Sequence, residues 1–83
     1  MTWEEVVKND SIADKVLKNI VRIFYEKARL VDKIKRMEIN RDNNTITLIV
    51  FPKMTGLFVG RRGQTLDALE RRLKRWKVMI EER

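Results

Sequence analysis

Two glycines bracket two arginines at Gly60-Arg61-Arg62-Gly63. A glycine has no Cβ atom and adopts positive φ readily, so the chain can turn sharply here and its N–H groups can be approached closely. The arginines add positive charge where the backbone adds hydrogen-bond donors. This combination suits a phosphate group, although a plain turn between two helices also favours glycine. The flanking sequence therefore has to decide between a binding loop and a simple turn.

The charge of the chain favours a polyanionic partner. Lys and Arg number 19 against 12 Asp and Glu, for a formal net charge of +7. Residues 53–83 hold nine cations and four acids, so this part of the chain carries +5 of the +7. Asp67 precedes Arg71 by four residues and Glu70 precedes Lys74 by four, which is the spacing of solvated ion pairs on a helix. We therefore expect Arg61 and Arg62, rather than the arginines that follow, to contact the polyanionic partner.

Several function classes lack the residues they need. The chain has no Cys and no His, so the usual zinc, copper and haem ligands and the common nucleophile-and-base pairs are missing, and we expect no enzyme activity, no metal and no cofactor. The apolar stretch from Ile46 to Phe51 is too short to span a bilayer, and the N-terminus has no signal pattern. We expect a soluble cytoplasmic protein.

Two helix-start patterns divide the N-terminal third. Thr2 with Glu5 predicts a short helix within residues 1–10, an N-terminal extension, and Ser11 with Asp14 predicts the start of a long helix and of one domain over residues 11–83. The long helix is expected to bury one apolar stripe: Ile12, Val16, Ile20, Phe24, Ala28 and Val31. Its charged residues are expected to point away from the core: Lys15, Lys18, Arg22, Glu26 and Arg29.

The rest of the chain alternates strands and helices. A period of two from Ile34, the polar turn 41–44 and the β-branched run from Thr45 to Phe51 predict a hairpin whose second strand is central. Pro52 ends that strand. Helices are predicted over 54–59 and after Gly63, and a closing strand over 77–82. The strands on either side of these two helices should lie parallel in one sheet.

The segment from Gly56 to Leu69, GLFVGRRGQTLDAL, resembles the core of a KH domain, and it is closest to bacterial Jag-type proteins and small single-KH proteins. The predicted element order also matches the type II arrangement of that family. The resemblance implies an α+β fold of order α-β-β-α-α-β, with a three-stranded mixed sheet and the helices packed on one face. It also implies a groove that holds about four nucleotides of single-stranded RNA or DNA.

The resemblance places a binding surface around the glycine loop. Gly60 and Gly63 permit close approach of the sugar-phosphate chain, Arg61 and Arg62 are its variable pair, and Gly56 is the small residue that begins the first helix. Beside the loop, Leu57, Phe58, Val59 and Leu66 can form an apolar wall of the kind on which bases settle, with Val59 and Leu66 fitting core positions better than base contacts. The candidate nucleic-acid-binding residues are Lys53, Gly56, Leu57, Val59, Gly60, Arg61, Arg62, Gly63, Gln64 and Leu66.

Our hypothesis is single-stranded nucleic-acid binding, with RNA the expected form and with a homodimer or a protein partner as a source of added avidity. Two alternatives remain open. One is a protein-interaction module on a KH scaffold, whose apolar faces, including Ile49 and Phe51, would contact another protein. The other is duplex DNA binding by the basic second helix, which the surrounding strands disfavour. Base preference and biological process lie beyond the sequence.

Overall fold

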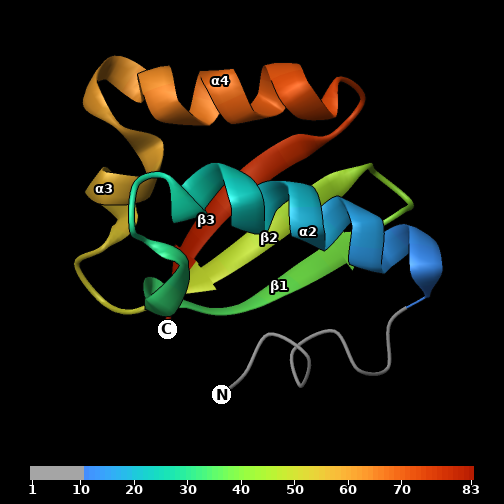
Figure 1. Cartoon of the computed structure of the whole chain (residues 1–83), viewed down its shortest axis with the longest axis horizontal. Helices are drawn as coiled ribbons and strands as arrows, with labels where there is room; N and C mark the ends of the chain where they lie inside the picture. Colours follow the sequence, from blue (N-terminus) through green and yellow to red (C-terminus); the bar gives the residue numbers. More distant parts are fainter. Residues whose placement is uncertain (1–10) are drawn as a thin grey trace.

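The computed structural model describes residues 11–83, in which helices cover a three-stranded sheet (Figure 1). The helices are α2 (Ile12–Glu26), α3 (Thr55–Val59) and α4 (Gln64–Leu73), and the strands are β1 (Ile34–Asn40), β2 (Thr45–Val50) and β3 (Lys77–Glu82). Two short 3₁₀ segments, η1 (Val31–Lys33) and η2 (Arg61–Gly63), join them. The helical extension predicted within residues 1–10 lies outside the described residues.

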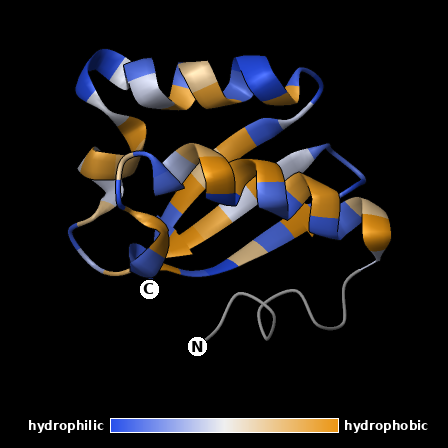
Figure 2. Ribbon diagram, in the orientation of Figure 1, coloured by the Kyte–Doolittle hydropathy of each residue, from blue (hydrophilic) through white to orange (hydrophobic). Residues whose placement is uncertain are grey.

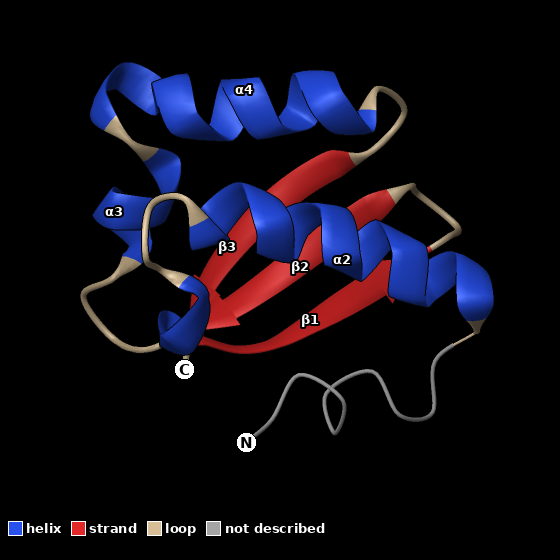
Figure 3. Cartoon of the chain, viewed as in Figure 1, coloured by secondary structure: helices blue, strands red, loops and turns tan. Residues whose placement is uncertain are grey.

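The sheet is mixed and has the order β1-β2-β3. Strands β1 and β2 form an antiparallel hairpin with Met37 opposite Leu48, and β2 pairs with β3 in parallel with Leu48 opposite Ile80. The connection from β2 to β3 runs through helices α3 and α4, as Figure 3 shows. The predicted parallel pairing and the central place of β2 are confirmed.

One hydrophobic core lies between the sheet and the helices. Alternate residues of β2 point into it, because successive side chains of a strand lie on opposite faces. Its buried members come from all three helices and all three strands: Val21, Tyr25, Met37, Ile46, Leu48, Val50, Phe58, Leu69, Leu73 and Val78. Burial of these side chains on a single face shows that the helices pack on one side of the sheet.

Helix α2 begins as predicted but buries a different face. The Ser11 side chain caps it by accepting a hydrogen bond from the N–H of Asp14 at 3.2 Å. The prediction of an inward stripe from Ile12 to Val31 is wrong, because the helix ends at Glu26 and its buried residues are Lys18, Val21 and Tyr25. Ile12 and Val16 are exposed, while Ile20 and Phe24 are half-buried at the margin of the core. Lys18, expected in solvent, is only 7% exposed.

The error has a simple geometric cause. Leu17, Val21 and Tyr25 also recur at steps of four, and on a helix with about 100° per residue Val21 lies roughly half a turn from Ile12. Both stripes therefore have the helical period, and periodicity alone does not say which one meets the sheet. Of the two, the stripe that carries Tyr25 packs against the strands.

Candidate nucleic-acid interface

The short helix α3 is fixed at its start by the last residue of β3. The Glu82 carboxylate accepts hydrogen bonds from the Thr55 hydroxyl at 2.6 Å and from the Thr55 N–H at 3.4 Å. The Thr55 hydroxyl, and then the backbone N–H of Lys53, lower the pKa of Glu82. The carboxylate therefore stays charged beside the first turn of α3, where the helix dipole favours a negative group. Lys53 itself is exposed and adopts a φ of 70°.

Residues 60–63, the GRRG loop, turn the chain from α3 into α4. Gly60 ends α3 by donating its N–H to the Gly56 carbonyl at 2.9 Å, and the Gly63 N–H donates to the Gly60 carbonyl at 3.1 Å. Three residues of the loop have positive φ: Gly60 at 80°, Arg62 at 57° and Gly63 at 76°. A Cβ atom on Gly60 would lie 2.1 Å from Oγ1 and 2.9 Å from the backbone N of Thr65. Only glycine fits at position 60.

A buried tyrosine ties the end of α3 to the core. The Tyr25 hydroxyl of α2 donates a hydrogen bond of 2.8 Å to the Phe58 carbonyl, and the two rings lie 4.7 Å apart between centroids. The Phe58 carbonyl belongs to the last turn of α3, where carbonyls have no partner within the helix. Burial raises the pKa of the Tyr25 hydroxyl, so it remains a donor. The Tyr25 hydroxyl therefore fixes the end of α3, where the chain enters the GRRG loop, to the core.

The two arginines of the loop are exposed and free to contact a ligand. In the part of the chain that the structure describes, neither Arg61 nor Arg62 makes an ion pair or a side-chain hydrogen bond, and no backbone bond uses their N–H groups. Helix α4 follows at once, with Gly63 as its N-cap and no side chain capping its first turn. Two cations, free N–H groups and the positive end of a helix thus meet at one point.

The apolar residues expected beside the loop divide between surface and core. Leu57 is 56% exposed, whereas Phe58 is fully buried, so the expectation that Phe58 lines a binding wall is wrong. Val59 and Leu66 are half-buried, and Leu66 packs against the core. Phe58 cannot contact a base because its ring packs in the core against Tyr25.

The structure brings most of the predicted site residues into one region. Gly56, Leu57 and Val59 belong to α3, the GRRG loop follows it, and Gln64 and Leu66 lie in the first turn of α4. Gly56 and Gln64 are exposed, and no atom lies within 4 Å of a Cβ placed on Gly56. Lys53 precedes α3, so a helix of five residues, about 7.5 Å long, separates it from the loop.

Two features of α4 were not expected from sequence. Arg72 lies over the ring of Phe24, with its guanidinium carbon 5.5 Å from the ring centroid, so α4 and α2 share a cation-aromatic contact. The Glu70 carboxylate, expected to pair with Lys74, accepts a hydrogen bond from the N–H of Val78 at 3.0 Å. It thereby satisfies a donor on the outer edge of β3. Tertiary packing creates both contacts, and neither follows from the spacing of side chains along α4.

Between residues 11 and 83 no group of three or more His, Cys, Asp or Glu is placed to hold a metal ion. Over the same residues no helix is long and apolar enough to cross a membrane.

Comparisons with protein-family models, with curated proteins and with solved structures found no match to this chain.

Proposed function

We propose that this protein has a KH-like fold of type II and binds single-stranded nucleic acid through the GRRG loop. The observation that carries the proposal is the convergence of glycine-dependent backbone, unpaired arginines and an uncapped helix start at residues 60–64. The element order and the parallel pairing of β2 with β3 support it. The choice of RNA over DNA rests on the KH resemblance.

The proposed contact begins with one phosphate group. Its oxygens accept hydrogen bonds from the free N–H groups of Arg61 and Arg62 and meet the positive end of α4. The two guanidinium groups neutralise this phosphate and its neighbours. Because Gly60 and Gly63 have no side chains, the sugar-phosphate chain can lie directly on the loop.

The adjacent bases lie on the apolar surface that α3 and α4 leave exposed. Leu57 offers most of its side chain to solvent, and the half-buried Val59 and Leu66 continue that surface toward the core. Apolar side chains contact base faces without requiring a particular base. We therefore expect modest affinity and weak sequence preference from this one surface.

The test is a charge reversal in the loop with a matched control. Arg61→Asp with Arg62→Asp is compared with Arg71→Asp with Arg75→Asp, which changes the net charge equally on an exposed part of α4 and the turn after it. Each variant is titrated with short RNA, short single-stranded DNA and duplex DNA at two salt concentrations. The loop variant should lose at least about tenfold in affinity for single strands, and its salt slope should fall by about 0.7 for each lost phosphate contact.

The control should lose only the part due to long-range attraction. Equal losses in both variants, or full binding by the loop variant, would show that the GRRG loop is not the contact. Preference for the duplex would favour the basic helix as the reader. Absence of any binding that depends on salt would favour the protein-interaction alternative. Circular dichroism and thermal unfolding confirm that each variant is folded.

A further inference from the structure

Helix α2 has an apolar face that lies mostly outside the core. Ile12, Val16 and Ile23 lie roughly opposite the buried residue Val21, and the half-buried Ile20, about 100° from Val21, borders the core. These four residues are here called the outer ridge. Ile12 is 82% exposed, Val16 56% and Ile23 42%, and these are three of the six large apolar side chains exposed in the described residues. Figure 2 shows the apolar colour reaching the first turn of α2, which is the end farthest from α3. A solvated helix face normally carries polar residues at such positions.

The spacing of the outer ridge suits a second helix. Its members follow one another at steps of four, four and three, which is the pattern by which one helix packs along another. All four are β-branched, and their side chains are therefore stiff and lose little entropy on contact. The ridge has no Trp, Tyr or Phe, the residues that anchor helices at a lipid surface. These features favour a protein partner over a membrane.

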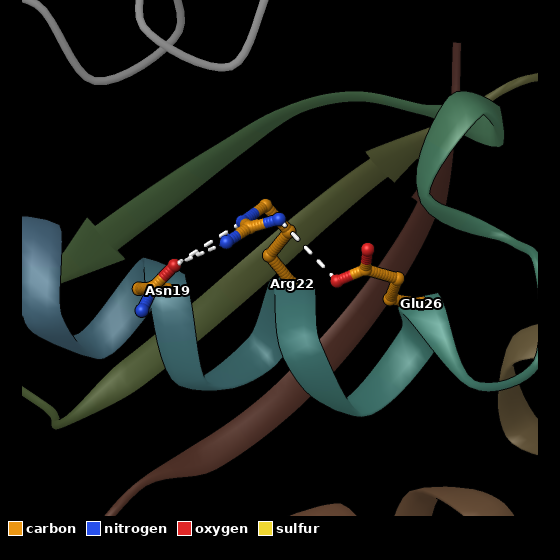
Figure 4. Close-up of polar contacts among 3 residues, drawn as sticks. All are labelled: Asn19, Arg22 and Glu26. Carbon is orange, nitrogen blue, oxygen red and sulfur yellow. Dashed lines mark hydrogen bonds and ion pairs between the residues drawn. The ribbon is translucent and has the colours of Figure 1, made fainter.

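The charges around the outer ridge define that partner further. The acids of α2 are occupied, because Asp14 pairs with Arg41 and Glu26 lies 3.4 Å from the Arg22 guanidinium. Figure 4 shows Arg22 lying along the helix between Asn19 and Glu26, with two further hydrogen bonds to the Asn19 oxygen. These two acids are therefore already neutralised, and the exposed cations beside the ridge set the sign of the charge there.

Exposed cations provide positive charge at several points along the helix. Lys15 lies on one flank of the outer ridge and Lys27 follows its last turn, and both are exposed and outside every ion pair of residues 11–83. On the other flank Arg72 of α4 lies over Phe24. A second copy of this chain would bring the same cations together in a protein of net charge +7.

We propose that the outer ridge of α2 binds an acidic amphipathic helix of a protein partner. Its apolar side packs on Val16 and Ile23, and its carboxylates face Lys15, Lys27 and Arg72. This inference is independent of nucleic-acid binding, because the ridge and the GRRG loop share no residue. A partner bound here would leave the loop free for its own ligand.

The test uses the full chain with labelled Ile and Val methyl groups and two synthetic helical peptides of about 20 residues. Both carry leucines at steps of four and three; one has glutamates on both flanks and the other has lysines. Only the glutamate peptide should shift the methyl signals of Ile12, Val16 and Ile23. Val16→Ser with Ile23→Ser should weaken its binding at least about tenfold.

Two controls separate the ridge from other surfaces. Met79→Ser removes an apolar side chain that is 47% exposed on the sheet, and it should bind the glutamate peptide as the parent does. The Arg61→Asp and Arg62→Asp variant should also keep peptide binding, and the ridge variant should keep RNA binding. Unfolding curves of the ridge variant should match the parent, since both side chains are exposed.

Four results would overturn the proposal. The first is no methyl shift with about 1 mM glutamate peptide, and the second is equal or stronger binding of the lysine peptide. The third is a loss of the ridge signals on vesicles containing phosphatidylglycerol without any response to either peptide, which would assign the ridge to a membrane. The fourth is a dimer in sedimentation of the parent chain that is absent in the ridge variant, which would assign the ridge to a second copy of this chain.

Discussion

The GRRG loop and the outer ridge of α2 are both exposed regions of the helical layer, but they are held in different ways. The loop depends on backbone geometry, since a single Cβ atom at Gly60 would overlap Thr65 and the chain before it is anchored by Tyr25. The ridge depends only on which side chains a regular helix presents. Single-atom changes should therefore disrupt the loop, whereas the ridge should accept many substitutions without loss of fold.

The largest expected effect comes from Gly60→Ala, with Gly56→Ala as its control. At Gly60 the added Cβ meets Thr65 at a positive φ of 80°, so we expect a loss of about 3 kcal/mol or more in unfolding free energy. At Gly56 no atom lies within 4 Å of the added Cβ and the residue is helical, so stability should rise by about 0.5–1 kcal/mol. Urea unfolding measures both, and equal effects would contradict a loop held by its backbone.

Tyr25→Phe should have the next largest effect. It leaves the buried Phe58 carbonyl without its hydroxyl donor and should cost about 1–3 kcal/mol in unfolding free energy. The melting temperature of the variant at pH 7 gives the first measurement. A change confined to stability, with methyl signals of the outer ridge unmoved, would show that the tyrosine supports the loop region and not the ridge.

The same substitution should change the pH dependence of stability. Burial raises the pKa of Tyr25 in the folded chain, while the unfolded chain loses this proton at about pH 10. The unfolded state then binds fewer protons, so the contribution of Tyr25 to stability is full below about pH 10 and is lost as the pH rises above it. Tyr25→Phe should reduce this alkaline loss; identical slopes for parent and variant between about pH 9 and 11 would refute the assignment.

The smallest effects separate the two loop arginines. Arg62 has a φ of 57°, so Arg62→Gly should relieve strain and raise the unfolding free energy by up to about 1 kcal/mol. Arg61 lacks a positive φ, and Arg61→Gly should lower it by up to about 1 kcal/mol. Each variant loses one charge, so both should weaken RNA binding. Opposite signs in stability with a shared loss of binding would indicate that Arg62 is kept for its charge at a cost in stability.

Local patterns predicted much of the fold. Ser11 and Asp14 located the start of α2, β-branched alternation located β2, and the closing strand was predicted with its observed bounds, 77–82. The junction before that strand has no glycine, and the residue with positive φ there is Lys74, at 54°. Hence the turn between α4 and β3 could not be recognised from residue types.

The sequence predicted where the loop lies in the chain, but not which of the apolar side chains beside it are buried. Gly60 with Gly63 marks the loop, since few residue types accept its dihedral angles. Phe58 was wrongly placed on the binding wall because its burial depends on Tyr25, which lies 33 residues earlier. Contacts over such a distance leave no local signal in the sequence.

The sequence by itself determined the positive charge, the order of helices and strands from residue 11 onward, and the place where glycine is required. These follow from properties that each residue carries with it: charge, period and allowed dihedral angles. Only the tertiary structure decided which stripe of α2 is buried, that Glu70 reaches β3, and that Ile12, Val16 and Ile23 remain outside. Such choices depend on which apolar faces meet, and that is settled when the chain packs as a whole.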